Sequence, residues 1–204
     1  MLKPDRLCAF SDGVMAIAIT LLVLGLEVPS VHEVPDLELP EYLLGTVHPL
    51  MGFVLSFALI GTYWLQHYAI FHYIEHVSRP LVLWNGLFLM CVTFVPFPTG
   101  LQATYRHDQL AMFLYGGTHF VCGLSLLILW IYATIEHRHV PPEIAPEIIK
   151  SMTWRISFTP ILSVVAVGVS FVNLDASKLM FLTIPVVYLS HRAVDRGWIR
   201  AENT

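Results

Sequence analysis

Charged residues are scarce in this sequence. Only 13% of the 204 residues are Asp, Glu, Lys or Arg, whereas 56% are hydrophobic and the mean hydropathy is +0.67. A soluble globular domain carries about 25% charged and about 45–50% apolar residues. This composition excludes a disordered chain, an ordinary soluble enzyme and a basic protein that binds nucleic acid.

Cysteine is also rare, and the common catalytic motifs are missing. The cysteines are odd in number and far apart, so they fit neither a disulfide framework nor a zinc site. We expect them to be small buried hydrophobes. The chain has no Gly-rich phosphate loop, no serine nucleophile elbow and no identifiable Cys/His catalytic pair. We therefore expect no enzyme activity, no cofactor and no small-molecule substrate. The three cysteines are Cys8, Cys91 and Cys122.

Long apolar blocks dominate what is present. A helix that spans a bilayer needs about 20 mainly apolar residues, and six blocks reach or approach that length. They predict an all-α integral membrane protein with six transmembrane helices, in a single domain that covers residues 1–204. The predicted spans are residues 7–26, 42–73, 80–100, 109–135, 152–172 and 177–193.

Proline and glycine shape these blocks. A proline inside a helix removes a backbone hydrogen bond and bends or breaks the helix. Pro96 therefore predicts that the third span kinks or ends early, and Pro160 and Pro185 predict bends in the fifth and sixth spans. The fourth span carries small residues that permit close contact with a neighbouring helix. These are Gly116, Gly117 and Gly123.

The distribution of lysine and arginine predicts the orientation. Nine of these residues fall at one end of the predicted spans and two at the other. Because basic residues are enriched in cytoplasmic loops, we expect a multi-pass protein of the cell membrane with both termini cytoplasmic. The nine are Lys3, Arg6, Arg79, Arg138, Lys150, Arg155, Arg192, Arg196 and Arg200; the two are Arg106 and Lys178.

The first span is the most informative segment because it contains Asp12. A carboxylate inside a membrane is costly and needs hydrogen-bond partners or a watery cavity. At about 100° per residue, four other side chains fall in one stripe, roughly 120° around the helix from Asp12. Asp12 therefore suits a buried, hydrogen-bonded tie to other helices. The stripe could face lipid, other helices or a pore, and periodicity alone favours packing against helices. Its members are Ile17, Thr20, Leu21 and Leu24.

This segment also carries a family signature. From Arg6 to Leu24 it follows the pattern R-x-x-x-F-S-D-G-V-x-A-I-A-I-T-L-L-V-L. The pattern resembles the signature of the transmembrane protein 175 family, the endosomal and lysosomal potassium channels and their prokaryotic homologues. Six predicted spans match as well, so the resemblance covers nearly the whole chain. Further matches are Trp64, His67, Trp84, Asn85 and residues 94–99.

The resemblance implies a function for the stripe. In the family, first helices of several subunits line the ion path, which maps the pore-lining positions onto the four stripe residues. Ile17 would form the tightest hydrophobic constriction, and the Thr20 hydroxyl would coordinate a potassium ion transiently, with no tightly bound metal. A structural network would tie the first helix to the second and third. The network residues would be Arg6, Phe10, Ser11, Asp12, His67, Trp84 and Asn85.

The residues restrict how such a pore can work. The sequence lacks both the T-V-G-Y-G filter loop and the arginine ladder of a voltage sensor. A narrow apolar neck that expels water remains as the gate. The signature occurs once, and one lining helix cannot enclose a pore, so closed cyclic symmetry is expected. Single-copy prokaryotic members of the family imply a homotetramer in the lipid bilayer.

Two other functions remain open at this point. His72 and His76 lie four residues apart beside Glu75, and on one helix face they could share a metal, as in a metal-dependent membrane enzyme; His67 fits this spacing less well. A proton or cation transporter centred on Asp12 is the other alternative, although no internal repeat is visible. His119, deep in the fourth span, is either a neutral hydrogen-bonded residue or a proton-sensitive group.

Overall fold

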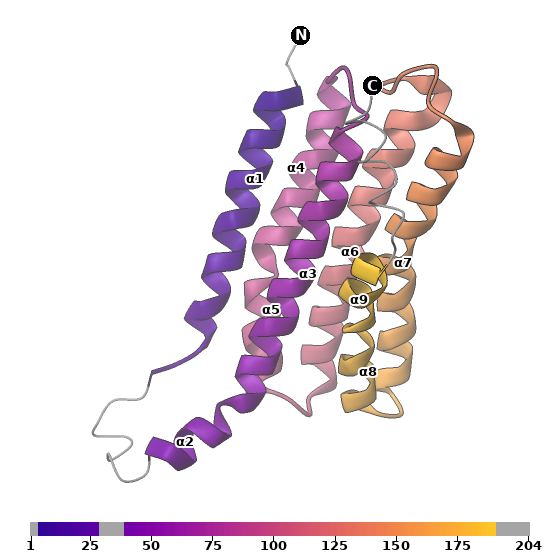
Figure 1. The fold of residues 1–204 in the computed structure, drawn as a ribbon. Coiled ribbons are helices and arrows are strands. Elements are labelled where there is room, and N and C mark those ends of the chain that lie inside the picture. The colour runs from indigo at the N-terminus through magenta and orange to yellow at the C-terminus, as the bar shows by residue number, and fades with distance from the viewer. Residues whose placement is uncertain (1–3, 29–38, 191–204) are drawn as a thin grey trace.

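The computed structural model describes residues 4–28 and 39–190, and they form a helical bundle (Figure 1). Five helices are long and apolar enough to cross a membrane, with bounds Pro4–Gly25, Val47–Phe71, Arg79–Thr104, Gln109–His137 and Pro146–Ser170. The chain is therefore an all-helical membrane protein. In order, the helices are α1 (Pro4–Leu21), η1 (Leu22–Gly25), α2 (Leu39–Gly45), α3 (Val47–Phe71), α4 (Arg79–Phe94), α5 (Pro96–Thr104), α6 (Gln109–Thr134), η3 (Ile135–His137), α7 (Pro146–Ser170), α8 (Leu174–Met180) and α9 (Thr183–Ser190).

Prolines divide the second and third predicted spans but not the fifth. The third span breaks at Val95 into α4 and α5, directly before Pro96, which confirms the predicted kink. The second block was expected to form one helix over 42–73, but it divides at Thr46 into α2 and α3. Pro49 explains the division, because it has no N–H to donate to the carbonyl of Gly45. α7 continues as one helix through Pro160.

The predicted sixth span is not one continuous helix. Residues 174–190 form two short helices, α8 and α9, and residues 191–193 of the predicted span lie outside the described part. The break comes before Pro185, which cannot donate to the Phe181 carbonyl. The amide of Ile184 donates to that carbonyl instead, at 3.2 Å, which closes a tighter turn.

The protein core lies around α6. Half of the most apolar 18-residue window of α6 is buried, against 22% of the corresponding window of α1. Figure 1 shows α1 at one edge of the bundle, beside α4 and α3, with α7, α8 and α9 at the other side. The core therefore forms without covering the outer side of α1.

Two glycines allow α6 and α7 to approach closely. A Cβ atom on Gly116 would lie 2.4 Å from Cγ2 of Val167, and one on Gly123 would lie 2.7 Å from Cδ of Pro160. The predicted close contact is thus confirmed for Gly116 and Gly123. Gly117 faces open space, because a Cβ atom on this residue would meet nothing within 4 Å.

Single polar side chains also join helices within the core. His119 of α6 is fully buried, and its Nδ1 lies 2.9 Å from the Tyr63 hydroxyl of α3. This contact fits the expected hydrogen-bonded histidine. Cys122 is buried as expected, whereas Cys8 and Cys91 are only half-buried, and all three thiols are free.

Candidate functional site

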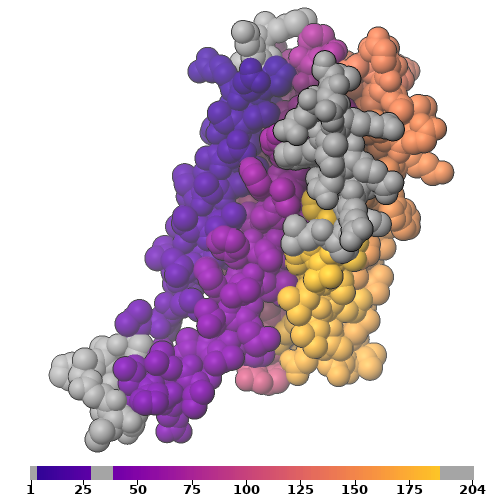
Figure 2. Space-filling view, viewed as in Figure 1, coloured from indigo at the N-terminus to yellow at the C-terminus, as the bar shows by residue number. Residues whose placement is uncertain are grey.

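The first helix has two different faces. Its inner face packs on the bundle through residues spaced three and four apart, as expected for one side of a helix. The outer face carries the predicted stripe, which the helices of the same protomer leave exposed: Ile17 is 59% exposed and Leu24 is 73% exposed. Figure 2 shows α1 along the edge of the molecule. The buried residues are Ser11, Met15, Ala18 and Leu22.

The stripe is therefore not explained by packing within one protomer. Leu21 and Thr20 are exposed beside Ile17 and Leu24. The Thr20 hydroxyl donates a hydrogen bond to the Ile17 carbonyl at 2.8 Å, as hydroxyls in helices commonly do. The hydroxyl proton is thus directed along the helix, and the oxygen keeps lone pairs that can accept a cation.

A chain of buried hydrogen bonds fixes the inner face of α1. Asn85 of α4 donates from Nδ2 to the Ser11 hydroxyl at 2.9 Å, and its Oδ1 accepts from Nε2 of His67 in α3 at 2.8 Å. Ser11 in turn donates to the Leu7 carbonyl at 2.8 Å. Ser11, Asn85 and His67 are each at most 1% exposed. α1, α3 and α4 are therefore joined at one point by hydrogen bonds between the side chains of Ser11, His67 and Asn85.

Stacked aromatic rings hold His67 in place within this chain. The imidazole stacks on Phe71 with centroids 4.3 Å apart and on Phe88 with centroids 5.8 Å apart. Because Asn85 Oδ1 can only accept, Nε2 of His67 carries the proton in this arrangement. The ring orientation and the hydrogen bond thus support each other.

Asp12 uses a different partner from the one expected. The indole Nε1 of Trp64 in α3 donates to Asp12 Oδ1 at 2.9 Å. Asp12 thus forms the expected hydrogen-bonded tie to a neighbouring helix, but its partner is Trp64 and not His67, Trp84 or Asn85, and Asp12 is exposed in the protomer rather than buried. Sequence reasoning missed this role of Trp64. The signal was its spacing: Trp64 and His67 lie three residues apart, on the same face of one helix.

The other predicted network residues lie apart from these hydrogen bonds. Arg6 and Phe10 are exposed near the beginning of α1. Trp84 is half-buried and packs against the apolar core. The structure thus brings together Ser11, His67 and Asn85 of the predicted network, and it leaves Arg6, Phe10 and Trp84 outside that contact.

The histidines of the metal hypothesis do not share a helix face. α3 ends at Phe71, so His72 lies in the turn that follows and His76 lies beyond it. The expected helical spacing of this pair is therefore wrong. Within residues 4–28 and 39–190, no group of three or more His, Cys, Asp or Glu side chains is placed to hold a metal ion.

Comparison with known proteins identifies the family to which this chain belongs. The family model described as endosomal/lysosomal potassium channel TMEM175 matches residues 6–96. A protein of Chamaesiphon minutus named as a potassium channel is 38% identical over 174 residues, 84% of this chain and 86% of that protein. The chain belongs to the TMEM175 family. A Streptomyces collinus member named as a potassium channel is 33% identical over 178 residues, with 85% of each chain covered.

Solved structures of the TMEM175 family share the fold. The crystal structure of a lysosomal potassium-selective channel TMEM175 homolog from Chamaesiphon minutus matches with a TM-score of 0.81 and 34% identity. The match covers 91% of this chain and 96% of that one. A more distant relative, from Danio rerio, is named as the endosomal/lysosomal proton channel TMEM175; it is 27% identical over 127 residues, 62% of this chain and 24% of that protein. The matched family region, residues 6–96, contains both the stripe and the hydrogen-bonded network.

Proposed function

We propose that this chain is one subunit of a potassium-permeable cation channel whose pore is lined by α1 of each copy. The observation that carries the proposal is the exposed apolar stripe along α1 and η1, opposite the face that the protomer buries; Leu24, its last member, lies in η1. The potassium channels named among the bacterial relatives support potassium as the permeant ion. These relatives are channels, which argues against a metal-dependent enzyme.

The stripe supplies a hydrophobic constriction. Rings of Ile17 side chains around a shared axis leave too little room for a hydrated ion, and a tight apolar ring expels water. Leu21 and Leu24 extend the apolar wall along the same path. A small outward movement of the α1 helices wets the neck and allows ions to pass. The Thr20 oxygen offers partial compensation for the water that a potassium ion loses.

Four copies complete the channel. Each chain offers one lining helix, so the pore requires an oligomer with closed cyclic symmetry, and we propose a homotetramer. We further propose that α8 and α9 together make the sixth crossing of each subunit. Residues 1–204 then form one channel domain.

The charges support an orientation with both termini in the cytoplasm. Arg6, Arg79 and Arg138 lie at helix ends that share one side of the bundle, whereas Arg106 lies at the other side, after α5. Basic residues prefer the cytoplasmic side. Lys3, Arg192, Arg196 and Arg200, which contribute to the same bias in the sequence, lie outside the described residues.

Potassium flux into liposomes tests this proposal. Wild-type protein, Ile17→Asn and Ile161→Asn are reconstituted at equal density. Ile161, on α7, is 54% exposed, close to the value for Ile17, so it is a matched control on another helix. We expect the Ile17→Asn variant to conduct at least about tenfold faster, because an amide ring wets the neck. The Ile161→Asn variant keeps the wild-type rate.

Two outcomes of this experiment contradict the proposal. Equal potassium flux through wild-type protein and Ile17→Asn would show that Ile17 does not form the constriction. Absence of potassium flux through wild-type protein and both variants would contradict the proposed channel function. A pH-sensitive dye in the same vesicles separates potassium entry from proton movement, which matters because the Danio rerio relative is named as a proton channel.

A further inference from the structure

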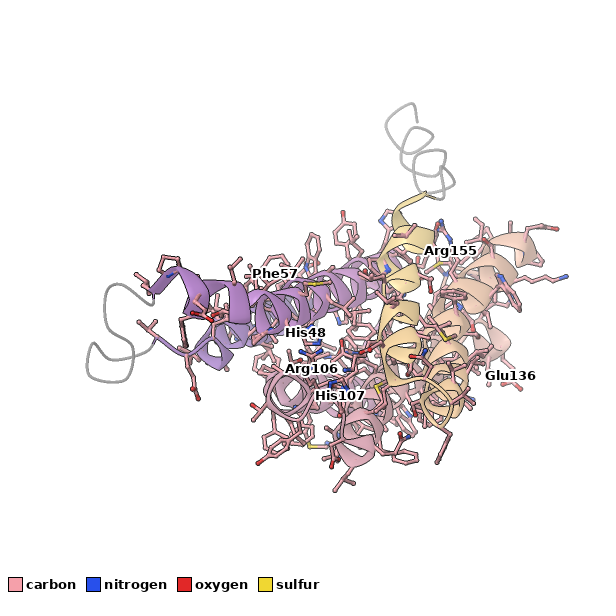
Figure 3. The ribbon with its side chains drawn as sticks, turned by 90° about the horizontal axis from the view of Figure 1, so that it is seen from below. His48, Phe57, Arg106, His107, Glu136 and Arg155 are labelled. Carbon is pink, nitrogen blue, oxygen red and sulfur yellow. The ribbon has the colours of Figure 1, made fainter. Side chains whose placement is uncertain are left out.

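A small cavity with a few polar side chains in its lining lies between α3, α7 and α9, away from the stripe and its anchors. Its volume is about 40 Å³, and its polar lining comes from Gln66, Arg155 and Thr159. A cavity needs roughly 10–15 Å³ to hold one water-sized group, so this one accommodates two or three such groups. Figure 3 shows Arg155 beside α9.

Three buried polar atoms in this cavity have no hydrogen-bond partner. They are Oε1 of Gln66, Nη2 of Arg155 and Oγ1 of Thr159. Gln66 is 2% exposed and Thr159 is fully buried. A buried polar group without a partner is destabilising, so three in one cavity indicate that the cavity takes a polar ligand.

The charge of Arg155 indicates the sign of that ligand. The guanidinium lies over the Tyr188 ring, with its Cζ atom 5.5 Å from the ring centroid. Among residues 4–28 and 39–190, Lys178 forms an ion pair with Asp175. No carboxylate of these residues forms an ion pair with Arg155. An arginine inside a membrane-spanning helix needs a counter-charge or a polar cavity. Arg155 therefore favours an anionic group.

The rim of the cavity lies on the outer surface of the bundle, where lipid contacts the protein. Gln66 lies five residues before the end of α3 at Phe71, about 7.5 Å along the helix axis, and Arg155 lies nine residues after the start of α7 at Pro146, about 14 Å along its axis. Trp154, at the rim, is 72% exposed on the outer surface of α7, as is typical of interfacial tryptophans. Basic pockets between transmembrane helices bind anionic headgroups.

We propose that this cavity binds a phosphate oxyanion, supplied by the headgroup of an anionic phospholipid. The Arg155 guanidinium donates to two phosphate oxygens in its usual forked geometry. The Thr159 hydroxyl donates to the same group, and a half-turn of the Gln66 amide directs its NH₂ into the cavity. Lipid binding at this site joins α3, α7 and α9 and is independent of the proposed pore.

Thermal unfolding of the purified protein in detergent tests the site. Phosphatidylglycerol, phosphatidylcholine or inorganic phosphate is titrated into wild-type protein and into Arg155→Gln, Thr159→Val and Lys150→Gln. Lys150 is an exposed cation on the same helix and serves as the control. We expect phosphatidylglycerol to raise the midpoint of wild type and Lys150→Gln equally. We expect Arg155→Gln to need at least tenfold more phosphatidylglycerol than wild type to reach half of its maximal rise in unfolding midpoint. Thr159→Val should need a few-fold more than wild type.

The arms of the titration distinguish the sources of the oxyanion. If inorganic phosphate alone gives the full shift with the same dependence on Arg155, the oxyanion site is supported and the lipid as its source is overturned. If Arg155→Gln and wild type respond to phosphatidylglycerol identically, the site itself is overturned. Equal shifts with phosphatidylcholine overturn the preference for an anionic headgroup.

Two further variants keep the test decisive. Arg155→Lys keeps the positive charge but loses the paired N–H groups of the guanidinium. We expect this variant to fold even if Arg155→Gln does not, and to bind phosphatidylglycerol with an affinity between those of wild type and Arg155→Gln. Asp195, outside the described residues, is the first carboxylate after α9 in the sequence. One further outcome overturns the lipid proposal. In it, phosphatidylglycerol raises the unfolding midpoint of Asp195→Asn but not that of wild type, which would mean that the Asp195 carboxylate occupies the cavity in place of a lipid.

Discussion

The first helix and the α6–α7 pair are held in the bundle by different means. α6 and α7 approach so closely that Gly116 and Gly123 have no room for a side chain. α1 has no comparable close contact at its one glycine, since a Cβ on Gly13 would meet nothing within 4 Å. It is held by the buried Ser11–Asn85–His67 chain and by the Trp64–Asp12 hydrogen bond. Close packing builds the core, and directional bonds fix how α1 is rotated.

This difference matters for function because rotation of α1 decides which residues face outward. Hydrogen bonds in a low-dielectric interior are directional and costly to break. With Ser11 held toward α4, Ile17 and Leu24 must lie on the opposite side. A helix held only by a smooth apolar face could rotate by one residue and lose this arrangement. The polar anchors therefore define the proposed pore surface.

Loss of Asn85 is expected to have the largest effect. Asn85→Ala leaves the buried Nε2–H of His67 without an acceptor and removes the donor to Ser11. We expect the free energy of unfolding to fall by about 2–3 kcal/mol. Titration with a denaturing detergent measures this change. Thr93→Ala is the control on the same helix, because the Thr93 hydroxyl donates only to the Met90 carbonyl nearby. An equal loss in both variants would show that Asn85 is not an anchor.

A methyl group at Gly123 is expected to cost somewhat less. Gly123→Ala places its Cβ against the rigid ring of Pro160, where neither backbone nor ring can give way easily. We expect a loss of about 2 kcal/mol in the free energy of unfolding. Gly117→Ala, six residues earlier on the open side of α6, should be neutral within about 0.5 kcal/mol. Equal stabilities of the two variants would contradict the close α6–α7 contact.

The Asp12 hydrogen bond should contribute least, because it is exposed in the protomer. A double-mutant cycle between Asp12→Ala and Trp64→Phe should give a coupling of about 1 kcal/mol in thermal or detergent unfolding. The same cycle with Trp84→Phe should give a coupling near zero. A larger coupling to Trp84, one of the network residues that the sequence predicted, would argue against Trp64 as the partner of Asp12.

The sequence predicted most of the fold because its signals are local. Apolar blocks gave the five long helices, Pro96 gave the break between α4 and α5, and the glycines gave the close contact of α6. The division at Thr46 and the separation of α8 from α9 also follow from prolines, Pro49 and Pro185. Their positions in the sequence did not show how completely each would interrupt its helix.

The anchors were harder to predict because they join residues far apart in the chain. Helical spacing separated Asp12 from the stripe, but it could not choose among the polar residues of the second and third spans. Side-chain reach decided this choice: Asn85 reaches Ser11, and Trp64 reaches Asp12. The histidine pair failed for a related reason, since α3 ends before His72 and the helical spacing stops there.

Cross-linking between subunits tests most directly whether the α1 helices of several copies converge. The protein, with Cys8, Cys91 and Cys122 replaced by alanine, carries either Ile17→Cys or Ile161→Cys and is treated in native membranes with a short bifunctional thiol reagent. We predict that the Ile17→Cys protein forms covalent dimers on a denaturing gel, whereas the Ile161→Cys protein stays monomeric. An Ile17→Cys protein that remains monomeric, or cross-links no better than the Ile161→Cys protein, would contradict a shared pore lined by α1.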